Sequence, residues 1–132
     1  MKFLLGGSPA FLFMVLIFWL SSLPGDTLPP PPFLFGDKLE HFLAYSVLGL
    51  LLAARRGFTG LGSGEKIFPW TAGGWMAPCV GIGYGIFDEI HQYFVPLRRC
   101  DGIDMAADAL GVLAGFYLLR LWDAKRRFGA FS

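Results

Sequence analysis

Residues 10–20 read AFLFMVLIFWL, and the chain carries no charged residue between Lys2 and Asp26. A helix needs roughly 20 apolar residues to cross the hydrocarbon core of a bilayer. The sequence therefore predicts a first membrane span over residues 3–23. A cleaved signal peptide with Lys2 as its basic end is the alternative, although the following Ser-Ser-Leu-Pro is a poor cleavage site.

The composition of the whole chain also favours a membrane protein. Of the 132 residues, 55% are hydrophobic and 16% are charged, whereas soluble domains usually carry about 25% charged residues. The net charge is only +1, so no strong positive field favours nucleic acid as a partner.

Three more segments have an apolar centre that is bounded by charges or by proline. Pro96 ends one of them, because proline cannot continue a helix. Four consecutive prolines favour an extended spacer between the first two spans, and a glycine-rich loop over 57–74 separates the second from the third. The prediction is an all-α fold, a polytopic membrane bundle of four transmembrane helices in one domain over 1–132. The later spans are expected at 38–54, 75–95 and 103–122.

Lysine and arginine set the expected orientation, because they are enriched in the cytoplasmic loops of membrane proteins. With both termini cytoplasmic, eight of these residues lie inside and three lie outside. The inner set is Lys2, Arg55, Arg56, Lys66, Arg120, Lys125, Arg126 and Arg127, and the outer set is Lys38, Arg98 and Arg99.

This topology brings polar residues from three spans and two loops to the outer end of the bundle. A charge at mid-bilayer costs roughly 2.5–3.5 kcal/mol, so such groups face the interior, pair with one another or line a hydrated cavity. The set is Asp37, Glu40, His41, Asp88, Glu89, His91, Gln92, Arg98, Arg99, Asp101, Asp104 and Asp108.

Helical spacing places several of these residues on shared faces. Spans three and four each carry two glycines and two polar residues in one stripe, which predicts glycine against glycine at the inner end and polar against polar at the outer end. We therefore expect one pocket between spans two, three and four, with Arg98 at its rim. The stripes are Asp37, His41 and Tyr45; Gly81, Gly85, Asp88 and Gln92; and Asp104, Asp108, Gly111 and Gly115.

The same residues resemble the VanZ-like family of membrane proteins over nearly the whole chain. The matching pieces are Ser-Ser-Leu-Pro after the first span, Asp37-Lys38-x-x-His41-Phe42-x-x-Tyr45-x-x-Leu48-Gly49, Asp88-Glu89-x-x-Gln92-x-Phe94-x-Pro96, and Asp104-x-x-x-Asp108-x-x-Gly111. The resemblance implies a multi-pass protein of the bacterial cytoplasmic membrane. It also implies a role in glycopeptide resistance or envelope homeostasis, since the founding VanZ is associated with low-level teicoplanin resistance.

The chain departs from the family pattern after the third span. The family commonly has Pro-Gly-Arg there, and an aspartate six residues after the arginine. Arg98 holds the arginine position by its spacing to Asp104, but Leu97 stands where glycine is usual. Glycine tolerates backbone angles that leucine resists, so the turn geometry at Leu97 does not follow from the resemblance.

Three functions fit the polar residues. The first is binding of a lipid or a lipid-linked envelope precursor, in which Arg98 grips phosphate or carboxylate at two points while Gln92 and Tyr45 add hydrogen bonds. The expected binding residues are Asp37, His41, Tyr45, Asp88, Glu89, Gln92, Arg98, Asp104 and Asp108.

The second function is an intramembrane hydrolase or transferase, with His41 as general base oriented by Asp37 or Asp88, and Glu89 as a protonated acid. The third is a structural or accessory subunit beside another membrane protein, in which Asp37, Asp88 and Asp104 neutralise Lys38, Arg98 and Arg99. We expect no cofactor and no metal. A site from His41, His91 and carboxylates is conceivable, but the histidines lack a metal-binding spacing.

Overall fold

The computed structural model describes residues 2–27, 29, 33–54 and 75–129, and these form four α-helices and no strand. The helices are α1 (Lys2–Ser21), α2 (Gly36–Ala54), α3 (Met76–Gln92) and α4 (Gly102–Gly129). The all-helical prediction is confirmed for these residues. Three of the four spacer prolines, at 30–32, and the glycine-rich loop at 57–74 lie outside the described residues.

Two helix ends differ from the expected boundaries by three residues or more. The third helix stops at Gln92 because the chain then tightens into turns, with Phe94 N bonded to His91 O and Val95 N bonded to Gln92 O. The fourth helix runs to Gly129, seven residues beyond the expected end at residue 122. Its basic tail contains no proline or glycine before Gly129, and lysine and arginine are good helix formers.

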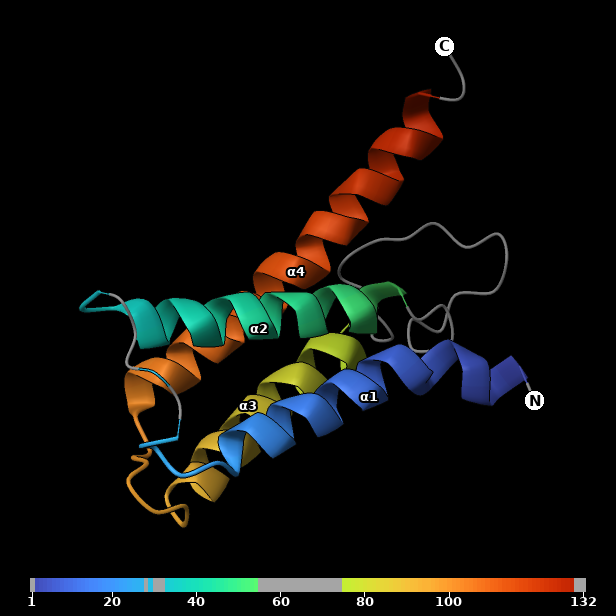
Figure 1. The fold of residues 1–132 in the computed structure, drawn as a ribbon. Coiled ribbons are helices and arrows are strands. Elements are labelled where there is room, and N and C mark those ends of the chain that lie inside the picture. The colour runs from blue at the N-terminus through green and yellow to red at the C-terminus, as the bar shows by residue number, and fades with distance from the viewer. Residues whose placement is uncertain (1, 28, 30–32, 55–74, 130–132) are drawn as a thin grey trace.

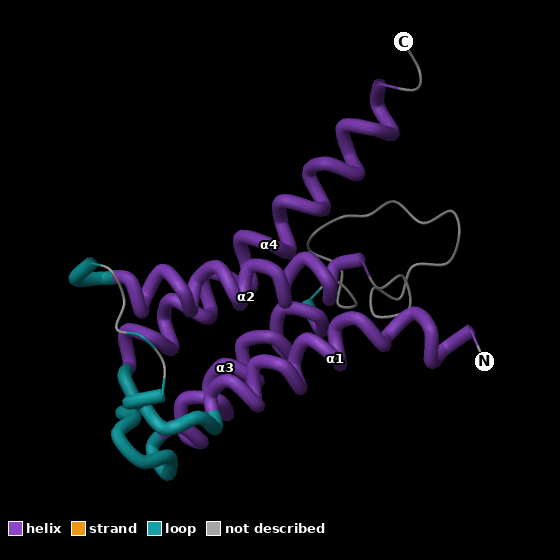
Figure 2. The backbone as a smooth tube through the Cα atoms, in the orientation of Figure 1, coloured by secondary structure: helices purple, strands orange, loops and turns teal. Residues whose placement is uncertain are grey.

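The helices alternate in direction, so the end of α1, the start of α2, the end of α3 and the start of α4 gather at one end of the molecule (Figure 1). The described part of the loop after α1 meets the loop after α3 at that end (Figure 2). The expected convergence of the polar residues at one end of the bundle therefore follows from the connectivity.

The most extensive helix contact joins α2 and α4. A Cβ at Gly111 would overlap the carbonyl oxygen of Phe42, and one at Gly115 would overlap that of Ser46. These glycines therefore bring the two backbones together. The expected pairing of glycine against glycine between the third and fourth helices is wrong, because Gly81 faces Val112 instead. A small-residue stripe shows that a neighbour approaches closely, but it does not show which one.

Within the described residues, the stretch Gly102–Asp123 is long and apolar enough to cross a membrane, and Pro9–Ser21 is a shorter apolar helix. The second and third helices do not combine this length with this apolar composition. The third helix has only 17 residues, and the second carries three charged residues, Asp37, Lys38 and Glu40.

Leu97 takes a left-handed backbone conformation, with φ of 62°. Glycine adopts this conformation at little cost, whereas a leucine is strained in it. The turn brings the Leu97 carbonyl against Gly25, whose N donates to Pro96 O at 3.1 Å. The loop after α3 is thereby joined to the loop after α1.

We predict that Leu97→Gly raises the free energy of unfolding by about 0.5–1 kcal/mol. The left-handed conformation costs a leucine roughly 1–2 kcal/mol, and the substitution removes this cost. Glycine loses more conformational freedom on folding than leucine does, which offsets part of the gain. The side chain is 75% exposed, so little burial is lost. Thermal unfolding in detergent measures the change. Leu97→Ala is the control, because it shortens the same side chain but keeps the strained Cβ, and a destabilised Leu97→Gly would contradict the prediction.

Candidate functional site

Lys38 joins three carboxylates where α2 and α4 begin. Its Nζ lies 2.8 Å from Asp37 Oδ2, 2.7 Å from Asp101 Oδ2 and 2.9 Å from Asp104 Oδ1. Hydrogen bonds from Lys38 lower the pKa of Asp37 and of Asp101, which both lie outside the expected spans. We call these four residues the Lys38 cluster. It ties the loop before α4 to the first turn of α2, as the structural interpretation expected for Asp37 and Asp104.

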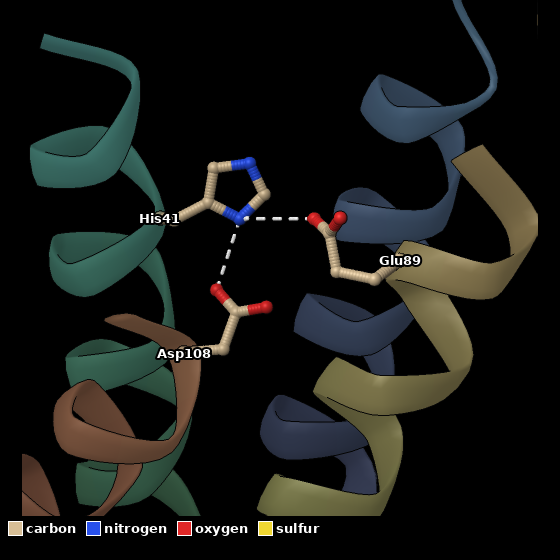
Figure 3. A group of neighbouring side chains, drawn as sticks. All are labelled: His41, Glu89 and Asp108. Carbon is tan, nitrogen blue, oxygen red and sulfur yellow. Dashed lines mark hydrogen bonds and ion pairs between the residues drawn. The ribbon is translucent and has the colours of Figure 1, made fainter. Parts of the chain in front are cut away.

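A second group, the His41 cluster, joins three helices (Figure 3). His41 Nδ1 on α2 lies 2.9 Å from Asp108 Oδ1 on α4 and 3.7 Å from Glu89 Oε1 on α3. The side chains of Glu89 and Asp108 are 0% and 1% exposed. The other Glu89 oxygen, Oε2, accepts a hydrogen bond from the backbone N of Asp101 at 2.9 Å. The histidine therefore contacts Asp108 and Glu89, and not the expected Asp37 or Asp88.

Asp88 accepts hydrogen bonds from two uncharged side chains. Ser21 Oγ donates to Asp88 Oδ2 at 2.9 Å, and Gln92 Nε2 donates to the same oxygen at 3.1 Å. Beside them, Ser22 Oγ and His91 Nε2 are 3.0 Å apart, so His91 belongs to the α1–α3 contact and not to the His41 cluster. Sequence reasoning did not place Ser21 in the site, although the Ser-Ser pair that ends the first apolar run was the available signal.

A cavity of about 270 Å³ lies between α1, α2 and α3. The pocket was expected between the second, third and fourth helices, and neither Asp104 nor Asp108 lines this cavity. Two buried polar atoms of its walls, Tyr45 Oη and Asp88 Oδ1, have no hydrogen-bond partner in the described structure. The lining residues are Ile17, Leu20, Ser21, Glu40, His41, Ala44, Tyr45, Asp88, Gln92 and Arg98.

Arg98, in the loop after α3, contacts the end of α1 and lines the same cavity. Its Nε donates to Leu23 O and its Nη2 to Leu20 O, both at 3.3 Å. Arg98 thus adds hydrogen bonds to one carbonyl in the last turn of α1 and one just beyond the helix. A guanidinium carries five N–H groups, and these two bonds leave others that a ligand could accept.

The sequence matches the model of a known protein family. The model of the VanZ/LLP1 family matches residues 9–123. The chain belongs to the VanZ/LLP1 family. No curated protein and no solved structure matches the chain.

The residues that carry the VanZ resemblance separate into three neighbouring groups. On α2, Asp37 enters the Lys38 cluster, His41 the His41 cluster, and Tyr45 the cavity wall. One helical face can serve all three groups because each successive residue lies one turn further along α2. The nine predicted binding residues are thus close in space, and five of them line the cavity between α1, α2 and α3: His41, Tyr45, Asp88, Gln92 and Arg98.

Proposed function

We propose that this VanZ-family chain is a multi-pass protein of the bacterial cytoplasmic membrane, and that the cavity between α1, α2 and α3 binds the head group of a lipid or of a lipid-linked envelope precursor. The observation that carries the proposal is the pair of unpartnered buried atoms in the cavity wall, Tyr45 Oη and Asp88 Oδ1. Buried polar groups are almost always hydrogen-bonded, so a ligand that reaches these atoms gains contacts that the protein does not make itself.

The cavity wall has the chemistry of an amphiphile site. Ile17, Leu20 and Ala44 offer apolar surface to an acyl or isoprenoid chain, and Arg98 offers a planar fork to a phosphate. The carboxylates of Glu40 and Asp88 lie in the same lining. A head group that combines a phosphate with hydrogen-bond donors, such as an amine or sugar hydroxyls, therefore matches the cavity better than a simple anion does.

The described surface supports a lipid environment. Large apolar side chains are exposed along every helix, and soluble monomers rarely expose contiguous apolar surface of this extent. At the same time the carboxylates of α3 are turned inward, where they avoid hydrocarbon. Examples of the exposed side chains are Phe11 at 65%, Trp19 at 58%, Leu43 at 53%, Phe87 at 53%, Leu110 at 60% and Leu118 at 63%.

We predict that Tyr45→Phe weakens lipid retention by roughly 2- to 10-fold without lowering the melting temperature. The hydroxyl lies near Asp88 but makes no hydrogen bond of ordinary length in the described structure, so its removal costs the fold little but takes about 0.5–1.5 kcal/mol from ligand binding. Native mass spectrometry of protein from mild detergent measures the lipid-bound fraction. Arg98→Ala and Gln92→Ala should lose more, because a charge-assisted bond contributes about 1.5–3 kcal/mol.

Tyr84→Phe is the matched control. It removes a hydroxyl that donates to Met14 O at 2.6 Å and does not line the cavity. We expect this variant to keep its lipid and to lose stability, the reverse of Tyr45→Phe. If the wild-type protein carries no lipid and takes up neither phosphatidylethanolamine, phosphatidylglycerol nor a lipid-linked sugar, the cavity is not a lipid site and the structural interpretation is preferred.

One contact favours a second candidate, an intramembrane hydrolase or transferase. His41 lines the cavity and lies 2.9 Å from Asp108. A carboxylate on one imidazole nitrogen orients the ring and leaves the other to act as a base. Turnover of a lipid-linked substrate that is lost in His41→Gln would support this function, whereas lipid binding without turnover would leave the binding function alone.

A further inference from the structure

Three side chains from three helices place potential metal ligands around one point (Figure 3). One nitrogen or oxygen from each of His41, Glu89 and Asp108 lies within 4.8 Å of the others. The two measured separations from His41 Nδ1 are 2.9 and 3.7 Å. Ligand atoms that share a cation at about 2.0–2.2 Å lie roughly 2.9–3.6 Å apart in octahedral or tetrahedral geometry, so the cluster is already close to a coordination shell.

Burial gives an independent reason for a cation. The side chains of Glu89 and Asp108 are 0% and 1% exposed. Glu89 Oε1, the oxygen that faces His41, has no hydrogen-bond partner in the described structure. A buried carboxylate must gain a counter-charge or a proton to offset its lost hydration. Two such groups with one histidine between them are short of positive charge unless a cation enters.

We propose that His41, Glu89 and Asp108 bind a divalent transition-metal cation of the Zn²⁺ or Mn²⁺ type. One imidazole nitrogen with two carboxylate oxygens suits these ions, whereas Ca²⁺ and Mg²⁺ prefer oxygen alone. In the metal-bound site the ring proton of neutral His41 lies on Nε2, and Nδ1, the nitrogen nearest Asp108 and Glu89, binds the cation through its lone pair. The backbone N of Asp101 holds Glu89 Oε2 at 2.9 Å, an outer contact of the kind that orients metal ligands.

Sequence spacing could not reveal this site. The three residues lie 48 and 19 positions apart in the chain and come from separate helices, so no local motif joins them. Metal binding by these three residues does not require a bound lipid. It can therefore be tested with the metal alone.

The test begins with chelator-treated protein in detergent, to which Zn²⁺, Mn²⁺, Co²⁺ or Ca²⁺ is added without lipid. We expect one Zn²⁺ or Mn²⁺ per chain by calorimetry and elemental analysis, a higher melting temperature with metal, and binding of Ca²⁺ that is at least about tenfold weaker. Bound Co²⁺ should show visible absorption bands, and their intensity reports the coordination number of the metal.

Glu89→Gln and Asp108→Asn should each weaken the binding of Zn²⁺ at least about 100-fold, since even outer-contact mutations cost 10- to 100-fold. Asp88→Asn is the matched control, because it removes a carboxylate that is equally buried and adjacent in sequence but outside the cluster, and we expect it to keep the metal. Wild-type protein that binds no Zn²⁺, Mn²⁺ or Co²⁺ would overturn the proposal even if a variant fails to fold. That result would mean that a proton balances the buried carboxylates. Unchanged affinity in a folded Glu89→Gln would overturn it as well.

Discussion

A Gly115→Ala variant is expected to separate α2 from α4 and to unfold roughly 5–10 °C below the wild type. A Cβ at this position would overlap the Ser46 carbonyl oxygen, and it would lie 2.8 Å from the carbonyl carbon and 3.0 Å from Leu50 N. Backbone atoms of a packed helix cannot turn aside as a flexible side chain can. Overpacking of this kind costs about 1–3 kcal/mol or more, which outweighs the roughly 1 kcal/mol that alanine gains in helix propensity.

Thermal unfolding in detergent, followed by tryptophan fluorescence, measures this loss. Gly83→Ala is the matched control, because it is also a mid-helix glycine but its Cβ would meet nothing within 4 Å. That variant should be unchanged or slightly more stable, by up to about 1 kcal/mol. Equal melting temperatures for the two variants would show that the α2 and α4 backbones are not in close contact at Gly115.

The element boundaries could be predicted because charges and prolines bound the apolar runs. Three of the four helices begin and end within about three residues of the expected positions at both ends. The fourth was underestimated because its basic tail continues the helix to Gly129. The gathering of polar residues at one end was also predictable, since alternating helix directions bring alternate ends together.

The partners of each residue were not predictable from one sequence. Periodicity shows which residues share a face, but four helices can be arranged in several ways around those faces. The glycines of α4 could therefore be assigned a close contact but not their true partner, α2. For the same reason the sequence pointed to one pocket, whereas Lys38 takes Asp37 and Asp104 into an ion-pair cluster and Ser21 enters beside Asp88.

Lys38→Met is expected to lower the free energy of unfolding by about 2–3 kcal/mol. The variant removes Lys38 Nζ, which lies 2.9 Å from Asp104 Oδ1, and leaves this carboxylate, which is only 10% exposed, without its cation. Breaking a fully buried pair costs about 3–5 kcal/mol, and the cost is smaller here because Lys38 is 20% exposed. Asp37 and Asp101 are 46% and 38% exposed, so their pairs add little. Thermal or denaturant unfolding in detergent checks the value.

The double variant Lys38→Met with Asp104→Asn separates lost attraction from buried charge. If the unpaired Asp104 carboxylate causes the damage, the second substitution should recover more than half of the lost stability, because it removes the charge that has no partner. Asp101→Asn alone should change the stability far less than Lys38→Met does, because exposed ion pairs contribute little. A double variant that is no more stable than Lys38→Met would show that Lys38 contributes through packing of its aliphatic chain instead.

The same cluster also makes a prediction about acid. Hydrogen bonds from Lys38 hold the pKa of Asp37 and of Asp101 below the ordinary value of 3.8. A carboxyl with a lowered pKa stabilises the fold above its ordinary pKa, and that stabilisation is lost as the pH falls through the lowered value. The melting temperature of the wild type should therefore decline below about pH 4, and Lys38→Met should decline less over the same range. An equal decline in both proteins would assign the acid sensitivity to other carboxylates, because without Lys38 neither aspartate has a lysine that lowers its pKa.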